Sequence, residues 1–248
     1  YERGLIALDT PAARYLPGFA AGGKQAITIR HLLTHYSGLA PDLPLDTPWQ
    51  GRTQAVRLVM ESHPTTPPGT QFVYIDINFI TLGLIVERLT GHTLADYATR
   101  HILAPLGLRR SLFRPPARLA TGIAPTQYDD DTHHMLRGVV HDPTARRMGG
   151  IAGHAGLFSC ADDMTRYARA LLDRRAGLAS AFPLQTRTLV LMSTPQQPPG
   201  KTDLRGLGWD IATHYSTPRG AVFPATSFGH TGFTGTSLWL VPDSRSFV

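Results

Sequence analysis

Residues 79–91, FITLGLIVERLTG, constrain the fold most, because they predict a helix that is apolar nearly all round. A helix without a polar face has to be buried on every side, so it belongs in the core of a substantial domain. Gly91 ends it, since glycine takes the left-handed conformation at helix C-termini most readily. The extended stretch QFVYIDIN comes directly before. We therefore expect Tyr74 and Asp76 at the start of a buried helix, beside an open cleft.

The composition is that of a soluble globular protein. The 248 residues suffice for one large domain, and no segment approaches the length and hydropathy of a membrane span. All but two of the 24 basic residues are arginines, and they are scattered without a basic stripe interleaved with aromatic residues. This pattern argues against a nucleic-acid partner. The single Cys160 excludes an internal disulfide and a cysteine metal cluster.

Helical patterns fill the middle of the chain and strand patterns its end. We predict helices after Thr28, closing near Gly38, and over 53–62, 94–103, about 161–172 and 184–193. Strands are predicted at 206–215, 221–230 and 234–242. Residues 106–148 lack periodicity and are read as a long surface excursion. Helices followed by a run of strands indicate an α+β fold with an antiparallel sheet.

Two histidine groups raise the question of a metal. His31 and His35 have the i, i+4 spacing of zinc proteases, but Leu32 stands where those enzymes carry glutamate. The other group has no diagnostic ligand spacing, so a solvated loop is favoured; it comprises Asp129–Asp131, His133, His134, His141 and Asp142. We predict no metal and no cofactor. A metal hydrolase built on His133, His134 and His141 stays an alternative hypothesis.

The stretch Phe228–Thr236, FGHTGFTGT, holds three glycines, three threonines and a histidine just before the strand-like SLWLV. Glycine within a strand pattern indicates a turn, a bulge or a place where a ligand approaches the backbone closely. A tight turn between two strands explains this stretch as well as a ligand does. The choice depends on the rest of the chain.

Five stretches in order resemble one family. They are ITIRHLLTHYSGL, PPGTQFVYIDINFITLGLIVERLTG, ILAPLGLRRSLF, RGVVHDPTARRMGGIAGHAGLFSCADDMTRYARALL and FGHTGFTGTSLWLVPD. They are similar to the penicillin-binding-protein-like serine hydrolases related to class C β-lactamases, D-alanyl-D-alanine carboxypeptidases and family VIII-type esterases. The resemblance runs from about Leu8 to the end. It implies one domain over 1–248, with a mostly helical lobe over about 28–200 packed on antiparallel strands from about 205–248.

The resemblance also implies roles for individual residues. Tyr74 would be the tyrosine that assists proton transfer, with Asp76 as its polar partner, and His230 would open the strand triplet. Thr231 and Gly232 would complete this triplet along the substrate, and the backbone N–H of Phe233 would donate to the oxyanion. These residues answer the question that FGHTGFTGT raises. The implied partner is a small-molecule or peptide substrate, and the implied location is exported or periplasmic.

The sequence departs from the family pattern in two ways. His230 and Asp76 stand where the β-lactam-hydrolysing branch has lysine and asparagine, which favours an esterase or a cell-wall D-amino-acid peptidase over a β-lactamase. No serine is followed three residues later by lysine, because Lys24 and Lys201 are the only lysines. We therefore expect a fragment, inactive alone, that lacks the N-terminal strands, the Ser-x-x-Lys helix and the C-terminal strand and helix. The alternative is a binding homologue that has lost the nucleophile.

Overall fold

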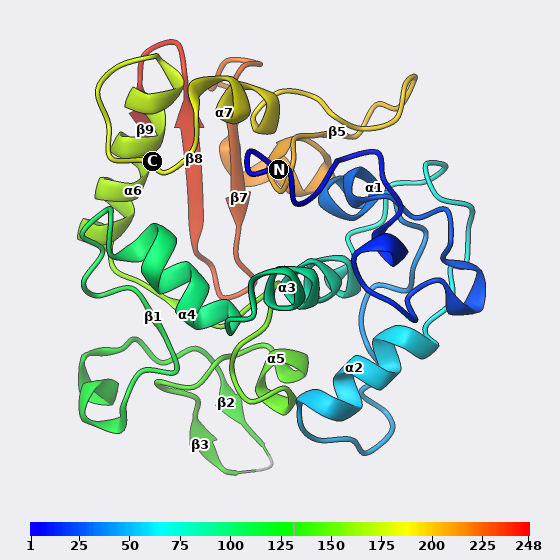
Figure 1. Cartoon of the computed structure of the whole chain (residues 1–248). Coiled ribbons are helices and arrows are strands. Elements are labelled where there is room, and N and C mark those ends of the chain that lie inside the picture. Colours follow the sequence, from blue (N-terminus) through cyan, green and yellow to red (C-terminus); the bar gives the residue numbers. More distant parts are fainter. Residues whose placement is uncertain (131) are drawn as a thin grey trace.

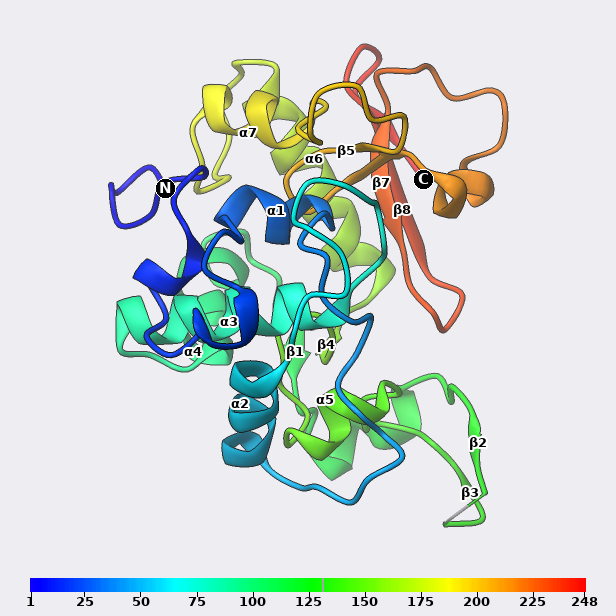
Figure 2. The ribbon, with the colours of Figure 1, turned by 90° about the vertical axis from the view of Figure 1, so that its right-hand side faces the viewer.

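A computed structural model describes residues 1–130 and 132–248 of the chain (Figures 1 and 2). Its helices are α1 (Ile29–Thr34), α2 (Arg52–Glu61), α3 (Asp76–Thr90), α4 (Leu94–Ala98), α5 (Pro143–Arg147), α6 (Ala161–Arg175) and α7 (Thr186–Met192). Short 3-10 or π turns cover Ala12–Arg14, Ala21–Gly23, Thr99–Leu103, Ala117–Gly122 and His214–Arg219. None of the helices in these ranges is long and apolar enough to cross a bilayer.

An antiparallel sheet takes up the C-terminal part of the chain. Its strands, in spatial order, are β5 (Leu204–Arg205), β6 (Asp210–Ala212), β7 (Phe228–Thr231), β8 (Ser237–Val241) and β9 (Ser246–Phe247). Two small antiparallel pairs lie in the helical part: β1 (Leu112–Phe113) with β4 (Leu157–Phe158), and β2 (Tyr128–Asp129) with β3 (His134–Met135). The α+β prediction is confirmed.

Helix α3 is the core element that its sequence predicts. It begins at Asp76 and ends before Gly91, whose φ of 69° is left-handed. Ile77, Ile80 and Ile85 are buried in a hydrophobic cluster with side chains of α1 and α2. A second cluster lies between the sheet and helices α6 and α7, and it includes Leu171, Phe228 and Leu240. In Figure 1, α1 and α2 lie to the right of the long strands β7 and β8, and α6 lies to their left.

Three local predictions need correction. Helix α1 closes at His35, which takes the left-handed φ of 62°, rather than at Gly38. Only Asp210–Ala212 of the expected strand over 206–215 is extended, and His214–Arg219 forms a 3-10 helix that Thr213 caps. The excursion over 106–148 holds a hairpin and helix α5, which Asp142 caps by accepting the N–H of Ala145. In each case a side-chain hydrogen bond or a left-handed residue decides a boundary that hydrophobic periodicity does not mark.

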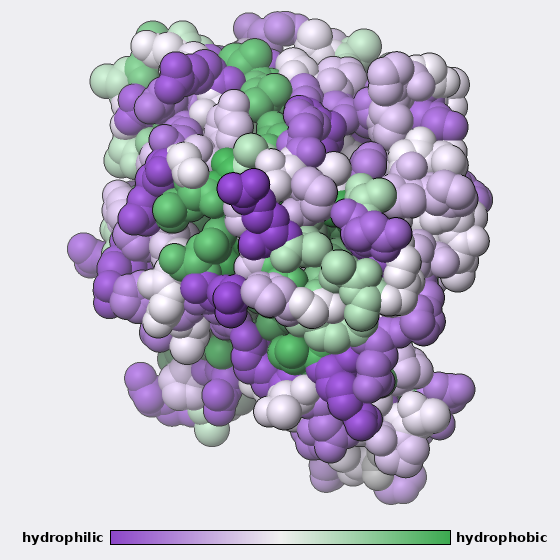
Figure 3. Space-filling view, turned by 45° about the vertical axis from the view of Figure 1, so that its right-hand side comes forward, coloured by the Kyte–Doolittle hydropathy of each residue, from purple (hydrophilic) through white to green (hydrophobic). Residues whose placement is uncertain are grey.

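The surface is mixed in polarity. Hydrophilic residues cover most of the face in Figure 3, and hydrophobic residues show mainly in a band left of its centre. Apolar atoms contribute more than half of the surface of ordinary folded proteins, so this band by itself assigns no partner.

Glycine 153 lets the loop before β4 lie directly on helix α3. A Cβ at this position would stand 1.8 Å from the carbonyl oxygen of Phe79, and a Cβ on Gly83 of the helix would stand 3.2 Å from the Cα of Gly153. We expect Gly153→Ala to destabilise the fold by roughly 1–3 kcal/mol or more, because backbone has to move. Urea denaturation measures this loss. Gly122→Ala is the control, since a Cβ there meets nothing within 4 Å. Equal stability of the two variants would contradict this account of the packing.

Candidate active site around Tyr74

The backbone beside Tyr74 is fixed by a buried histidine. His35 is enclosed at the end of α1, and its Nδ1 accepts the N–H of Ile75 at 3.0 Å. Its ring stacks on the ring of Tyr74 with centroids 4.4 Å apart. Because Nδ1 accepts a hydrogen bond, the proton of the neutral ring is on Nε2. A single side chain thus holds both the ring of Tyr74 and the peptide that follows it.

A small network of polar side chains holds the first turn of α3 in place. Ser37 Oγ donates to Asn78 Oδ1 at 2.5 Å, and Asn78 Nδ2 lies 3.5 Å from His35 Nδ1. The N–H of Asp76 donates to the carbonyl of Pro41 at 2.6 Å. Buried networks whose members are hydrogen-bonded make a local structure rigid. The first turn of α3 is therefore held on two sides.

The predicted strand residue His230 lies beside Tyr74. Their ring centroids are 5.8 Å apart, although the two residues belong to distant parts of the chain. His230 Nδ1 lies 2.8 Å from the carbonyl oxygen of Thr231, so Nδ1 donates and Nε2 of the neutral ring is an acceptor. The structure brings together the two side chains that the sequence singles out.

The edge of β7 next to His230 is open over its last residues. Strand β6 pairs with β7 only at Asp210 and Gly229. Among the described residues, no strand pairs with His230 and Thr231 on that side, whereas β8 pairs with both on the other. An extended peptide or acyl chain could add to this free edge as a further strand.

The glycines of FGHTGFTGT have structural reasons of their own. A Cβ on Gly229 would stand 2.6 Å from the ring of Trp239, and one on Gly232 would stand 2.3 Å from Thr236 Oγ1. Gly235 has a left-handed φ of 89° in the turn between β7 and β8. This stretch can therefore form a tight turn and also bind a ligand, because the turn between β7 and β8 follows directly after the open edge at His230 and Thr231.

Aromatic side chains surround the other face of Tyr74. Tyr215 lies 5.4 Å from it between ring centroids and is 43% exposed. Phe72 lies 5.8 Å from His214, which in turn contacts Tyr215 at 4.0 Å. These rings form a partly exposed apolar wall that can hold an apolar or planar group next to Tyr74.

Acidic side chains and a histidine gather around Asp76. His154, which is buried in the loop before β4, donates from Nε2 to Asp142 Oδ1 at 2.8 Å. Asp76, Asp142 and His154 each offer an atom within 4.8 Å of the others. A third carboxylate, Asp42, accepts the hydroxyl of Thr144 at 2.9 Å. Three carboxylates and one imidazole thus come together at the start of α3.

The pKa values of Asp76, Asp142 and His154 shift in different directions. Burial raises the pKa of Asp76 to about 6, with Asp42 and Asp142 adding to the rise and His154 opposing it. Burial opposes the charged forms of Asp142 and His154 too, but their mutual hydrogen bond prevails, lowering the pKa of Asp142 and raising that of His154. The two shifts favour the ion-paired form, in which the imidazole has no nitrogen lone pair free for a metal. The geometry favours an ion-pair network over a metal centre.

The phenol of Tyr74 is a weak acid in this environment. Burial, with Asp76 adding to its effect and Arg205 opposing it, raises the pKa of Tyr74 to about 12. A phenolate at neutral pH needs cationic neighbours, and within the described residues Arg205 is the one that lowers the pKa of Tyr74. Tyr74 is therefore a proton donor here at neutral pH.

Phe233 lies in the turn between β7 and β8, and its side chain is 92% exposed. Its ring stacks on His141 of the 106–148 excursion, with centroids 5.1 Å apart. The N–H of Phe233 makes no hydrogen bond within 1–130 and 132–248, so it is a free donor one residue beyond Gly232. In Figure 2 the β7–β8 turn and the β2–β3 hairpin project on the same side of the molecule.

The earlier metal candidates are dispersed. His31 caps α1, accepting the N–H of Thr28 through Nδ1, while His35 supports Ile75. His133 and His134 lie in the exposed β2–β3 hairpin, Asp131 is outside the described residues, and Asp142 belongs to the group around Asp76. The structure does not bring these side chains to one point.

Two further features lie apart from Tyr74. Lys24 is buried and donates to the carbonyls of Met60 and Ser62, so it is a structural lysine.

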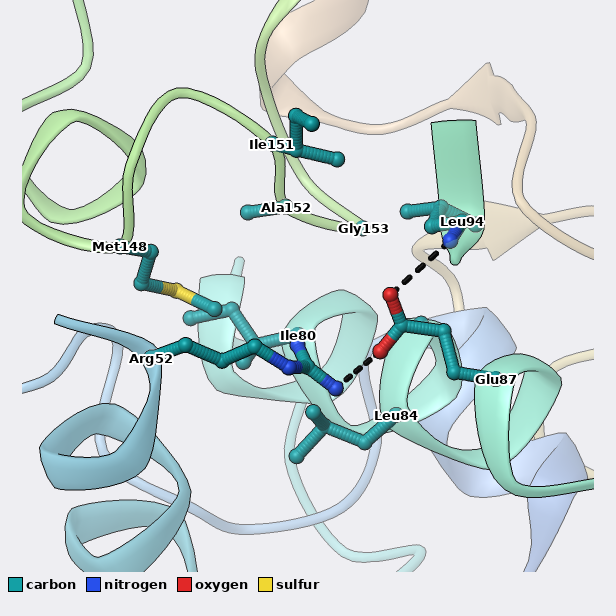
Figure 4. Close-up of a pocket in the computed structure, with 10 residues that line it drawn as sticks. Arg52, Ile80, Leu84, Glu87, Leu94, Met148, Ile151, Ala152 and Gly153 are labelled. Atoms are coloured by element: carbon teal, nitrogen blue, oxygen red, sulfur yellow. Dashed lines mark hydrogen bonds and ion pairs between the residues drawn. The ribbon is translucent and has the colours of Figure 1, made fainter. Parts of the chain in front are cut away.

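The cavity in Figure 4 lies between α2, α3 and the Gly153 loop, and its volume of about 10 Å³ holds little more than one water. Arg52 and Glu87 form an ion pair across it, and Glu87 also accepts the N–H of Leu94 at 2.9 Å. This cavity is a small gap between packed elements and not a binding site.

Sequence reasoning missed several residues of the site. In the sequence, His154 stands out only as part of a family-like stretch, and Asp142 only as a metal candidate. Arg205 and Tyr215 belong to no recognisable motif. Charge and residue type at these positions give no signal by themselves, because the partners lie in segments far apart in the chain.

Comparison with known proteins places the chain in a family context. The family model described as Beta-lactamase matches residues 1–248. A putative D-alanyl-D-alanine carboxypeptidase of Salmonella paratyphi A is 30% identical over 268 residues, which cover 96% of this chain and 60% of that protein. The chain thus spans about three fifths of the length of this curated relative.

Solved structures share the fold. A β-lactamase/D-alanine carboxypeptidase from Pseudomonas syringae superposes with a TM-score of 0.72 at 17% identity, over 99% of this chain and 72% of that one. A family VIII carboxylesterase gives a TM-score of 0.73 at 19% identity, over 98% and 69%. At such identities the likeness concerns the fold alone.

Asp76 makes the stability of the protein depend on pH. Its folded pKa of about 6 lies above the ordinary 3.8, so the folded state loses stability as pH rises between these values. We expect Asp76→Asn to be more stable than the natural chain by about 1–2 kcal/mol at neutral pH, after allowance for partial exposure. The difference should vanish below about pH 3, where the carboxyl is protonated in both states.

Urea denaturation at the two pH values measures this dependence. Asp46→Asn is the matched control, because Asp46 is exposed and lies outside the group around Asp76. An advantage of Asp76→Asn that stays the same at both pH values would disprove the electrostatic account.

Proposed function

Because the chain belongs to the β-lactamase family, we propose that it is the larger part of a serine hydrolase that works through an acyl-enzyme. The substrates we propose are esters or amides, with an esterase or cell-wall D-amino-acid peptidase favoured over a β-lactamase. The nucleophilic serine and its lysine would lie in a Ser-x-x-Lys segment outside these 248 residues. An exported or periplasmic location is part of this proposal.

The observation that carries the proposal is the meeting of Tyr74 with His230 beside the open edge of β7. A substrate added along this edge would run past both side chains. Its carbonyl oxygen could accept the N–H of Phe233, and one such donor typically contributes about 3 kcal/mol to the transition state. The aromatic wall of Phe72 and Tyr215 would contact the acyl or leaving group.

Chemistry follows from the roles of these groups. The serine oxygen attacks the carbonyl carbon, and its proton passes to the Tyr74–lysine pair. The bond to the alcohol or amine then breaks, and the leaving group takes that proton. Water repeats the sequence on the ester intermediate and releases the acid. We assign Asp76 to hold the lysine ammonium, because its carboxylate makes no hydrogen bond within the described residues and lies near the carboxylates of Asp42 and Asp142.

His230 supports the proposed preference for esters or peptides over β-lactams. Burial and the charge of Arg205 lower the pKa of His230, so its ring is neutral at working pH. A neutral ring attracts the carboxylate of a β-lactam less than the lysine of the drug-hydrolysing branch does. This supports ester or peptide substrates without a fixed anionic group at that point.

Tyr74→Phe tests the proposal in the protein that carries these residues together with Ser-x-x-Lys. We expect kcat to fall by about 10²–10⁴-fold with little change in KM, since general acid–base assistance is worth that much. Hydrolysis of a p-nitrophenyl ester, a D-alanyl-D-alanine peptide and a chromogenic cephalosporin should be compared. Mass spectrometry should detect the acyl-enzyme.

Tyr128→Phe is the control for that experiment, because Tyr128 is exposed in the β2–β3 hairpin. Equal activity of Tyr74→Phe and the natural protein would remove the role of Tyr74. If the sequence before Tyr1 in the natural protein holds neither the serine nor the lysine, the binding homologue replaces the enzyme.

A further inference from the structure

Arg205 on β5 is a buried cation with few partners. Its side chain is 1% exposed, and Nε and Nη2 make no hydrogen bond within the described residues. The facing carboxylate of Asp210 lies 3.7 Å away, and its Oδ1 also lacks a hydrogen bond. Charged side chains are seldom buried without close pairing, because desolvation is costly. This arrangement calls for a reason outside packing.

Strand β5, which carries Arg205, lies next to the end of α1. The hydroxyl of Tyr36 donates to the carbonyl of Asp203 at 3.2 Å, and the N–H of Gly208 donates to the carbonyl of Leu33 at 3.0 Å. Residues on both sides of Arg205 are therefore attached to the end of α1, where His35 carries Tyr74. Both ribbon views show β5 beside α1 (Figures 1 and 2).

Sheet pairing connects the same arginine to His230. Arg205 pairs with Asp210 on β6, and Asp210 pairs with Gly229 on β7, next to His230. The charge of the Arg205 guanidinium acts on Tyr74 and His35 at the end of α1 and on His230 of β7. No other charged residue of the described chain influences all three of these groups.

We propose that Arg205 is the fixed positive charge of this site and acts as a positioning residue through Tyr74 and His230. The inference rests on the function proposed above. In the β-lactam-hydrolysing branch the resemblance implies a lysine at the strand position of His230. Here the positive charge would instead come from Arg205 on β5. Arginine suits this place, because its guanidinium keeps its charge when buried whereas lysine loses its proton more readily.

Two chemical consequences follow. Repulsion from Arg205 keeps the ring of His230 neutral, so Nε2 stays a hydrogen-bond acceptor toward substrate or Tyr74. Attraction to Arg205 opposes the rise in the pKa of Tyr74 and so helps the hydroxyl to give up its proton. The other ionisable groups that act on these two residues are Asp76, Asp142, Tyr215 and Asp210.

Opposite substitutions in the Arg205–Asp210 pair test the proposal directly. The pKa of His230 is measured by NMR titration of its ring, assigned with His230→Gln, in the whole protein. Arg205→Met should raise this pKa, because the repulsive charge is gone. Asp210→Asn should lower it, because a neighbouring negative charge is gone, and the pKa of Tyr74 should fall as well. Loosened packing alone would move His230 in the same direction in both variants, and that result would overturn the proposal.

Further variants keep the test decisive if a single change unfolds the chain. Arg205→Met combined with Asp210→Asn removes both charges and avoids an unpaired buried carboxylate. It should place the pKa of His230 between those of the single variants, and a value equal to that of Asp210→Asn would refute the role of Arg205. Arg205→Lys should restore the natural value in part. Arg175→Met is the matched control, because Arg175 lies over the ring of Phe228 in the second core and should leave His230 unchanged.

An activity measurement separates this inference from the proposed function. If the natural protein hydrolyses esters, Arg205→Met should lower kcat by roughly tenfold or more and leave KM nearly unchanged. A natural protein without activity removes the proposed function, while the NMR shifts still decide whether Arg205 sets the charge of His230. An active protein whose kcat is unaffected by Arg205→Met would refute the role of the arginine alone.

Discussion

The hydrogen bond from the N–H of Ile75 to His35 Nδ1 is the interaction on which the site depends. It fixes the peptide between Tyr74 and Asp76, and the histidine ring stacks against Tyr74 at the same time. The left-handed backbone of His35 ends α1 and turns the side chain toward α3. The end of α1 and the start of α3 therefore depend on one residue. Any change that moved His35 would move both candidate catalytic side chains together.

Charges of opposite sign act on Tyr74 from two directions. Asp76, with Asp142 close by, lies at the start of α3, whereas Arg205 lies in the sheet. The negative group is partly balanced by His154, and the positive one by Asp210. Because burial strengthens each of these interactions, small changes in pairing shift proton affinities at the site strongly. A phenol between two such groups can respond to a third charge brought by a nucleophile segment or a substrate.

Much of the fold follows from local signals. The apolar pattern of 79–91 predicted α3, Thr28 predicted the start of α1, and the order of helices and strands predicted the α+β class. The β-lactamase resemblance is confirmed by the family match over the whole chain. Sequence also selected Tyr74 and His230, whose catalytic roles stay predictions. It did not select His154 or Arg205, because a buried charge leaves no periodic trace and the groups on which these two act, Asp76 and Tyr74, are distant in sequence.

The sequence by itself determined which residues form the buried helix, where a polar tyrosine–aspartate step precedes it, and that a glycine-rich turn follows a histidine-bearing strand. Hydrophobic periodicity, capping side chains and the conformational freedom of glycine suffice for these. Only the tertiary structure decided that Tyr74 lies against His230 and that Asp142 and His154 surround Asp76. It also decided that the glycine at 153 lies on the backbone of α3. The reason is physical: proton affinity depends on burial and on charges a few ångströms away, and packing of separate segments sets both.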